Sequence, residues 1–268
     1  MTALNRRVIL SGVAGFTAAA LLRDARAAPY PERPITLVVP FAPGGSTDIL
    51  ARLVAGYLHQ ALGQPVIVEN RSGASGNIGT AIVANGAGRS HVLVQYDECA
   101  HYEPRALCRD AVRWCERLLP ITMLAYATNT MVLHPSVPAS NVRELIAYAK
   151  ANPGKIAYAS AGAGSTNQLC GALFEKMTQV SMVHVPYRGG APAIADTVAG
   201  QTQLMFTAGT QSLEHVKAGT LRLLAVTEAK RSPLLPNVPT VAQTVPGFEM
   251  AVWYWHFPGD HQSAEYRD

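Results

Sequence analysis

Apolar residues alternate along this chain between short continuous runs and longer stretches at helical spacing. The continuous runs predict buried strands at 35–40, 66–69, 130–134, 156–160, 182–185, 203–206 and 221–227. Apolar positions three and four residues apart predict helices at 49–62, 81–84, 142–149, 167–178, 193–199 and 211–218. Strands that alternate with helices in this way are typical of mostly parallel α/β sheets.

The predicted helices carry end signals. Gly63 stands where a left-handed C-terminal cap is expected after the helix at 49–62. Asn141 and Glu144 have the spacing of a capping box, and 152–154 (Asn-Pro-Gly) ends the helix that follows them. Because the strand–helix series occurs twice, we expect two lobes with a cleft between them, lined by the loops that follow the strands.

Four glycine-rich loops each precede a predicted helix, at 44–48, 72–79, 162–166 and 188–190. The first N–H groups of a helix have no acceptor within that helix, and the helix dipole favours negative charge there. Glycine also lets the backbone approach a ligand closely. The loops therefore predict an anion-binding site, in which Ser46 and Thr47 donate from their hydroxyls or cap the helix, and Asp48 caps it.

Motifs of common α/β enzymes do not fit these loops. A P-loop requires a lysine after its glycines, and none of the four loops has one. The third loop has the first half of a dinucleotide fingerprint but not its last glycine, and Ser46 and Ser165 lack the frame of a nucleophile elbow. The histidines lack metal-ligand spacing, and His184 is expected to be structural. The sequence therefore predicts a binding protein and not an enzyme.

Residues 1–27 have the features of an export signal. An arginine pair at 6–7 precedes an apolar segment at 8–22, and 25–27 (Ala-Arg-Ala) is a predicted cleavage site. The arginine pair is also compatible with the twin-arginine route. The chain has 22 Lys+Arg and 18 Asp+Glu, but cleavage would leave 18 and 17. The basic charge therefore gives no indication of nucleic-acid binding, and we expect a protein of the periplasm.

The glycine loops lie within five long segments, which are YPERPITLVVPFAPGGSTDILARLVAGYL, GQPVIVENRSGASGNIGT, PASNVRELIAYAKANPGKIAYASAGAGST, MVHVPYRGGAPAIADTVAGQ and LRLLAVTEAKRSPLLPNVPTVAQTVPGFE. Over residues 28–85 and 118–254 the chain resembles the Bug/TctC family, the extracytoplasmic solute-binding proteins of tripartite tricarboxylate transporters. The resemblance implies an α/β fold of the two-lobed periplasmic-binding-protein type (type II), each lobe a mostly parallel sheet flanked by helices. It also implies a monomer without cofactor or metal that captures a small organic carboxylate for membrane permease subunits.

The resemblance further implies which residues bind the carboxylate. Those of the first lobe are Pro43, Gly44, Gly45, Ser46, Thr47 and Asp48, together with Ser72, Gly73, Ala74, Ser75, Gly76 and Asn77. Those of the second lobe are Ala163, Gly164, Ser165, Thr166, Tyr187, Arg188, Gly189 and Thr207. Backbone amides and ordered water would supply most of the contacts. Packing is the alternative role for Tyr187 and Arg188, and Thr207 replaces an aspartate common in the family, which can change the preferred ligand.

Residues 86–117 depart from the family pattern. They contain ten Asp, Glu, Lys or Arg residues and three of the four cysteines, Cys99, Cys108 and Cys115. In an exported protein, a divergent insertion with a disulfide would explain this composition. We favour a frameshift that begins near 86–95 and is restored near 118, because permitted codons for 107–118 give, one base later, a segment like that of the family.

The resemblance stops after Tyr254, where family members continue with further helices. The expected division is therefore an export signal at 1–27, a first lobe at 28–126, a second lobe at 127–224 and a truncated return to the first lobe at 225–268. A non-functional or marginally stable product is the alternative function, an α/β hydrolase is less favoured, and a signalling receptor stays open. Citrate-like acids, dicarboxylates, aromatic acids and amino acids all remain candidate ligands.

Overall fold

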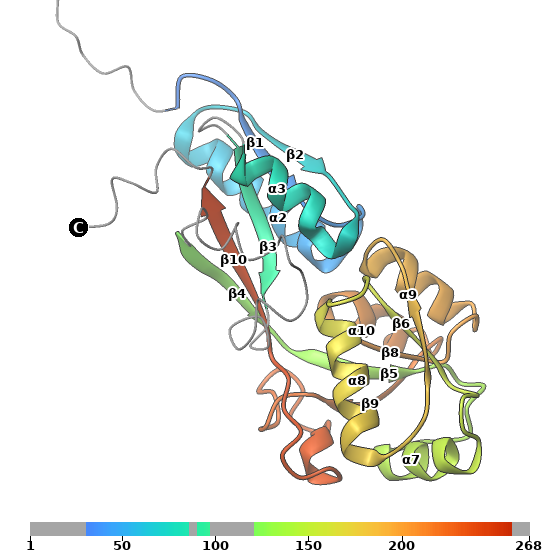
Figure 1. Ribbon diagram of the computed structural model, residues 1–268. Helices are drawn as coiled ribbons and strands as arrows, with labels where there is room; N and C mark the ends of the chain where they lie inside the picture. Colours follow the sequence, from blue (N-terminus) through green and yellow to red (C-terminus); the bar gives the residue numbers. More distant parts are fainter. Residues whose placement is uncertain (1–30, 86–89, 97–120, 259–268) are drawn as a thin grey trace, which may run out of the picture. The chain divides into compact units, whose positions relative to one another are not determined.

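In the described part of the chain, ten strands form two five-stranded sheets, which we call sheet A and sheet B (Figure 1). The computed structural model describes residues 31–85, 90–96 and 121–258. Both sheets lie in the unit that begins at Pro34. The two-lobed α/β fold that the sequence predicts is confirmed.

Sheet A has the strand order β2-β1-β3-β10-β4. Its strands are β1 (Ile35–Val39), β2 (Val66–Asn70), β3 (Ser90–Tyr96), β4 (Thr122–Ala127) and β10 (Val252–Pro258). The first three run parallel, whereas β10 pairs antiparallel with both β3 and β4. The last described strand therefore returns to the sheet in which the first strand lies (Figure 1).

Sheet B has the order β7-β6-β8-β5-β9. Its strands are β5 (Asn129–Leu133), β6 (Ala157–Ser160), β7 (Val183–Pro186), β8 (Leu204–Ala208) and β9 (Arg222–Val226). β6 pairs parallel with β7 and β8, whereas β5 pairs antiparallel with β8 and β9. Each sheet is therefore mostly parallel, with one antiparallel strand in the fourth place.

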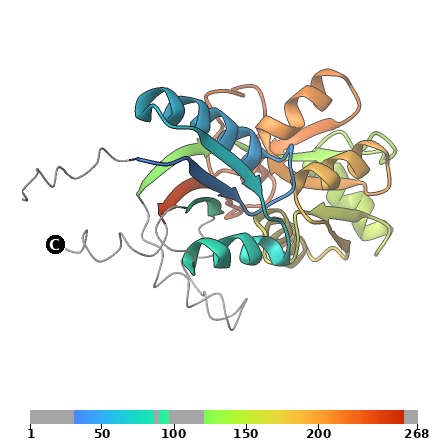
Figure 2. The same ribbon diagram turned by 90° about the horizontal axis from the view of Figure 1, so that it is seen from above.

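Of the described helices, two cover the opposite faces of sheet A, α2 (Ser46–Leu62) and α3 (Asn77–Ala84), the latter preceded by a 3₁₀ turn at Ala74–Gly76. Alternate residues of β1 face them. Leu37 and Val39 pack in one cluster with Ala51 of α2, and Val38 packs in another with Val83 of α3. Because both faces of the sheet are covered by a helix (Figure 2), successive residues of β1 are buried, and all but Thr36 of the run at 35–39 are apolar.

Sheet B is covered by four of the helices in the described part of the chain. They are α7 (Val142–Ala151), α8 (Thr166–Thr178), α9 (Gly190–Val198) and α10 (Gly209–Lys217). Phe206 of β8 packs with Phe174 of α8, their ring centroids 6.0 Å apart, whereas the adjacent Met205 packs with Ile194 of α9. The same alternation therefore places α7 and α8 on one face and α9 and α10 on the other.

Two segments of chain connect the sheets and bind each other. Thr128 joins β4 to β5, and its Oγ1 lies 2.6 Å from Ser232 Oγ in the return between β9 and β10, which includes a 3₁₀ turn at Val241–Gln243. Asn129 N donates to Glu228 Oε1 at 2.9 Å. Glu228 is only 6% exposed, so a carboxyl group is buried where the chain crosses between the sheets.

The helices begin earlier than the apolar pattern predicts. α2 begins at Ser46 rather than 49, α3 at Asn77 rather than 81, α9 at Gly190 rather than 193 and α10 at Gly209 rather than 211. The reason is that these first turns contain mostly small or polar residues, such as Ser46 and Thr47 of α2 and Gly209 and Thr210 of α10, which give no apolar period. The predicted end of α2 is confirmed, since Gly63 adopts the left-handed conformation (φ 67°).

The capping signal of α7 is confirmed in a shifted form. Asn141 Oδ1 accepts from Glu144 N at 2.9 Å, as a capping box requires. The Glu144 carboxylate, however, accepts from the N–H of Ser140 at 2.7 Å rather than from that of Asn141.

Part of the segment expected to be aberrant forms regular structure. Ser90–Tyr96 is β3, which lies between β1 and β10 and was not predicted; β4 and β10 were not predicted either. The three cysteines at 99, 108 and 115 lie outside the described residues, as does the export signal at 1–27. The disulfide and frameshift hypotheses, the signal and the lobe boundaries at 126 and 224 therefore stay predictions.

Candidate functional site

Glycine loops that are far apart in the sequence contact one another. Ala42 N donates to Arg188 O at 3.3 Å, and Ser75 Oγ donates to Ala163 O. A Cβ on Gly189 would lie 2.8 Å from Ala42 N, so this approach requires glycine. The loops that follow β1 and β2 of sheet A thus meet those that follow β6 and β7 of sheet B.

Two cavities lie among these loops. The larger, about 230 Å³, is lined by Phe41, Gly73, Ala74, Ser75, Gly76, Ala161, Gly162, Ala163, Tyr187 and Arg188. The smaller, about 10 Å³, is lined by Phe41, Gly45, Ser46, Thr47, Ala161, Asn167, Gly190, Thr207, Ala208 and Gln211. Phe41 and Ala161 line both, so the two cavities adjoin. The smaller has room for about one water or ligand oxygen, and the larger for a small organic molecule.

Four helix N-termini meet at the smaller cavity. Its lining includes Ser46 of α2, Asn167 of α8, Gly190 of α9 and Ala208, which precedes α10. None of these four N-termini has a side-chain cap, whereas α7, which does not line the cavity, is capped by Asn141. Because the first N–H groups of a helix lack partners within it, the cavity presents hydrogen-bond donors and partial positive charge.

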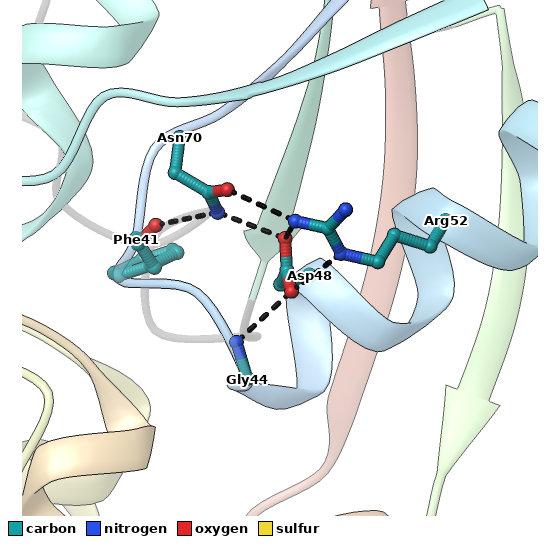
Figure 3. A network of polar contacts seen from close by, with 5 residues as sticks. All are labelled: Phe41, Gly44, Asp48, Arg52 and Asn70. Carbon is teal, nitrogen blue, oxygen red and sulfur yellow. Dashed lines mark hydrogen bonds and ion pairs between the residues drawn. The ribbon is translucent and has the colours of Figure 1, made fainter.

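Asp48 holds the loop that leads into α2 (Figure 3). Its Oδ2 accepts from Gly44 N and from Arg52 Nε, both at 2.9 Å, and its Oδ1 accepts from Asn70 Nδ2 at 2.9 Å. The same Asn70 amide donates to Phe41 O at 3.1 Å. Burial alone would raise the pKa of Asp48, but the hydrogen bonds from Arg52, Gly44 and Asn70 bring it below its ordinary value. The carboxylate of Asp48 therefore fixes the loop that leads into α2 and does not face the cavity.

The loop after β2 is held in a strained backbone conformation. All residues of Gly73–Gly76 have positive φ, including Ala74 (φ 46°) and Ser75 (φ 54°). Positive φ is uncommon for residues with a Cβ and tends to occur at functional sites. Here it accompanies the bond from Ser75 Oγ to Ala163 O, at the wall of the larger cavity.

Tyr187 and Arg188 both line the larger cavity, and Tyr187 has a structural role as well. The Tyr187 hydroxyl donates to Asp196 Oδ2 at 2.7 Å, and its ring packs against the cluster that contains Ala193. Burial, followed by the hydrogen bond and the charge of Asp196, raises the pKa of Tyr187 to about 12. Tyr187 therefore both packs in the core and lines the larger cavity.

Thr207 and Gln211 form a polar pair at the smaller cavity. Thr207 Oγ1 donates to Gln211 Oε1 at 2.9 Å, and Thr207 O accepts from Thr130 Oγ1 at 2.7 Å. Gln211 Nε2 is buried and has no hydrogen-bond partner among the described residues. A Cβ on Gly45 would lie 3.8 Å from this nitrogen. The carboxamide is thus held by its oxygen, and its NH₂ group lies beside the N-terminus of α2.

A serine–histidine pair exists, but it is structural. Ser160 Oγ lies 2.6 Å from His184 Nε2, and the ring of Tyr158 stacks on His184. Ser160 is fully buried, and its Oγ also bonds to the backbone of Gly162 at 3.1 Å. Burial lowers the pKa of His184, against a smaller opposing effect of Glu175. Neither residue of the pair lines a cavity, so it ties β6 to β7 and offers no accessible nucleophile.

Most of the expected site residues lie at or beside the cavities. Those that line the larger one are Gly73, Ala74, Ser75, Gly76, Ala163, Tyr187 and Arg188, and those that line the smaller one are Gly45, Ser46, Thr47 and Thr207. The others lie in the same loops and first turns but line neither cavity, namely Pro43, Gly44, Asp48, Ser72, Asn77, Gly164, Ser165, Thr166 and Gly189. Contact of any of them with a ligand stays a prediction.

Seven lining residues were not among the expected ligand-binding residues, although Gly162 and Gly190 belong to the predicted glycine loops: Phe41, Ala161, Gly162, Asn167, Gly190, Ala208 and Gln211. Four of them, Gly162, Asn167, Gly190 and Ala208, directly adjoin predicted site residues. Gln211 was read as the first residue of a helix, and nothing in its neighbourhood marked it as facing a ligand. A polar residue in the first turn of a helix that follows a strand directly was the one available signal.

Two further observations concern the residues that the structure describes. None of their helices is long and apolar enough to cross a membrane. Their His, Cys, Asp and Glu side chains form no group of three or more that could hold a metal ion, and Cys170 is a buried thiol whose Sγ accepts from Asn129 Nδ2 at 3.4 Å.

A family model described as "Tripartite tricarboxylate transporter family receptor" matches residues 50–259 of this chain. The match continues past Tyr254, where the resemblance was expected to stop, and its range includes 86–117. Among curated proteins, "Protein BugT" of Bordetella pertussis is 36% identical over 228 residues, which are 84% of this chain and 70% of that protein.

Solved structures of similar proteins share the fold. "R. palustris Rpa4515 with adipate" has 36% identity and a TM-score of 0.82, covering 88% of this chain and 80% of that one. "MatC (Rpa3494) from Rhodopseudomonas palustris with bound malate" has 26% identity and a TM-score of 0.79, covering 88% and 81%.

Proposed function

This chain belongs to the tripartite tricarboxylate transporter family of receptors, and on that premise we propose that it captures a small organic acid at the two adjoining cavities and delivers it to the membrane subunits of a transporter. The family consists of periplasmic solute-binding receptors and not of enzymes. Two similar proteins were solved with adipate and with malate, which supports a carboxylate as the ligand class.

The observation that carries the proposal is the meeting of four uncapped helix N-termini at the smaller cavity. An anion there accepts from N–H groups that otherwise lack partners, and it lies at the positive ends of four helix dipoles. One carboxylate oxygen occupies the smaller cavity and the rest of the acid occupies the larger one. Capture by amide donors needs no covalent chemistry.

Different residues of this chain have different roles in capturing the acid. Gly45, Ser46 and Thr47 present the donors of α2, and the Asp48 network keeps the preceding loop in place. Ser75 and Ala163 close the larger cavity from its two sides, and Arg188 adds positive charge at its wall. An α/β hydrolase is not favoured, because Ser160 is buried away from both cavities. A non-functional product is not favoured either, since the receptors to which this chain is similar align with most of its length.

The test is direct titration of the purified exported protein with adipate, malate, succinate and citrate by calorimetry, with thermal melting in parallel. Gly45→Asp is the decisive variant. The Gly45 backbone is extended (φ −76°, ψ 167°), and a Cβ there has no contact closer than 3.5 Å, so the substitution fits. The new carboxylate would cap α2 and occupy the anion position itself. We expect a few tenths of a kcal/mol of added stability together with loss of acid binding.

Gly45→Asn is the matched control, because it adds nearly the same bulk and also caps the helix but carries no charge. A larger loss of binding in the aspartate variant than in the asparagine variant supports an anion site. Binding of an acid by Gly45→Asp with unchanged affinity, or no binding of any acid by the folded wild-type protein, contradicts the proposal.

We also propose that the chain is exported through residues 1–27 and acts as a monomer. N-terminal sequencing of the periplasmic protein tests the first statement, with Ala28 as the expected first residue. Mutation of the arginine pair at 6–7 to lysine tests the twin-arginine route. Sedimentation with and without adipate tests the second, and a stable dimer would contradict it.

A further inference from the structure

Around the smaller cavity there are more unpaired hydrogen-bond donors than unpaired acceptors, because most carbonyl groups there already accept a hydrogen bond. Phe41 O accepts from Asn70, Phe206 O from Asn167 Nδ2, and Thr207 O from Thr130. The donors, in contrast, are the uncapped helix ends and the NH₂ group of Gln211, whose nitrogen has no partner among the described residues.

The larger cavity has the same imbalance. Gly162 O accepts from Ser165 N and Ser165 Oγ, Ala163 O accepts from Ser75 Oγ, and Arg188 O accepts from Ala42 N. Where a carbonyl is already engaged, a second donor competes with an existing bond.

Among the residues that the structure describes, no aspartate or glutamate lines either cavity. The acids close in the structure to lining loops are already paired, since Asp48 binds Arg52 and Asp196 accepts the Tyr187 hydroxyl. Among the described residues, a ligand ammonium group would therefore meet no carboxylate and mostly carbonyls that already have partners, and it would lie at the positive ends of four helices.

We propose that this receptor selects organic acids without an amino group, and that Gln211 is a specificity-determining residue that donates from Nε2 to the ligand carboxylate at the N-terminus of α2. This inference rests on the proposed function and adds the ligand class. Thr207 is a positioning residue, because its hydroxyl holds Gln211 Oε1 and so directs the NH₂ group of the carboxamide.

The position of Gln211 gives this contact a second consequence. Gln211 belongs to α10 over sheet B, whereas Gly45 and Ser46 lead into α2 over sheet A. A single carboxylate that accepts from both is bonded to both sheets at once. The affinity for the acid therefore depends on α2 and α10 lying close together, as well as on the donors of α2.

The experiment uses three pairs of probes that differ by one ammonium group: succinate and aspartate, glutarate and glutamate, and adipate and 2-aminoadipate. Calorimetry with the purified full-length protein gives the affinity of each. We expect the plain acid to bind at least roughly tenfold tighter in every pair that binds, because an unpaired buried ammonium loses at least that much.

Two variants test Gln211. Gln211→Met keeps the length of the side chain but removes the donor, and we expect a roughly ten- to hundredfold loss of affinity for the plain acids. Gln211→Glu keeps the acceptor for the Thr207 hydroxyl and adds a carboxylate, so we expect loss of the plain acids and a relative preference for the amino acids. Gln60→Met and Gln60→Glu are the controls, since Gln60 is exposed on α2, and they should bind as the wild type does.

Each outcome decides the question, with melting curves confirming that each variant is folded. An amino acid that binds as tightly as its plain partner, or an unchanged affinity in Gln211→Met, overturns the inference and leaves the proposed function intact. Binding of none of the six acids overturns the proposed function and the inference with it. The inference is supported by a preference for plain acids in the wild type, together with lower affinity in Gln211→Met and a reduced preference in Gln211→Glu, while the Gln60 variants bind as the wild type does.

Discussion

Asp48 Oδ2 accepts a hydrogen bond from the backbone N–H of Gly44 at 2.9 Å, so the first turn of α2 holds the loop that precedes it. The same carboxylate binds Arg52 and Asn70, and Asn70 belongs to the neighbouring strand β2 (Figure 3). Asp48 is 3% exposed, so its charge is partly desolvated and depends on these partners. The loop that leads into α2 is therefore held in place by the fold itself.

Replacement of Asp48 by asparagine should destabilise the protein by about 2 kcal/mol at neutral pH, because three donors lose a charged acceptor. Because the folded-state pKa of Asp48 is lowered below its ordinary 3.8, its contribution is present above that value and disappears as the pH falls through the lowered folded value. Urea denaturation of both proteins across that pH range measures the difference.

The control for Asp48 is Glu214→Gln, which breaks an exposed pair with Lys217. This substitution should leave the urea midpoint unchanged, as expected for a solvated ion pair. A midpoint shift as small for Asp48→Asn would show that the network contributes little to the fold.

Replacement of Gly190 by alanine should weaken acid binding by roughly tenfold without unfolding the protein. The new Cβ would lie 2.7 Å from Gln211 Oε1 and 2.8 Å from Gln211 Nε2, so the carboxamide must move away from the cavity. Titration with adipate measures the loss. Gly56→Ala is the control, because nothing lies within 4 Å of a Cβ there, and it should keep the affinity while adding about 0.5–1 kcal/mol of helix stability.

Glu228 should make the protein less stable as the pH rises. Burial raises the pKa of Glu228 above its ordinary 4.5, against smaller lowering effects of backbone N–H groups, so the folded state holds the proton more tightly than the unfolded state does. Stability therefore falls as the pH rises from 4.5 through the raised folded value. Glu228→Gln, which keeps the acceptor for Asn129 N, should flatten this dependence in thermal melts.

The control for Glu228 is Glu249→Gln, an exposed glutamate of the same return segment, which should keep the pH profile of the wild type. Parallel profiles of the wild type and Glu228→Gln between pH 4.5 and neutrality would refute the assignment.

Replacement of Ser75 by alanine should cost about 1 kcal/mol, because it removes the bond to Ala163 O and keeps the strained backbone. Ser75→Gly also removes the bond but relieves the positive φ of 54°, so it should cost less than the alanine variant. Chemical denaturation of the two variants gives the comparison. Equal losses in both would mean that the loop conformation stores no strain at this residue.

The apolar pattern predicted the strand–helix order over much of the chain, because each buried element must turn its apolar residues toward a core. It failed at the first turns of α2, α9 and α10, which contribute residues to the smaller cavity, and at the first turn of α3, which directly follows Gly76 of the larger cavity. It also missed β10, whose place between β3 and β4 depends on pairing with residues far away in the chain. The pattern therefore missed two kinds of element: the helix starts that form or adjoin the site, and the strand that pairs with residues far from it in the sequence.

The sequence by itself determined that the glycine loops are anion-binding candidates, because glycine and hydroxyl residues before a helix expose N–H donors whatever the surroundings. Only the tertiary structure decided how these donors are combined. Asp48 is directed to Gly44 and Arg52, whereas Gln211 presents an unpaired NH₂ group beside Gly45. The physical reason is that a hydrogen bond depends on distances of about 3 Å between groups that the sequence separates widely, and only packing of the two sheets sets those distances.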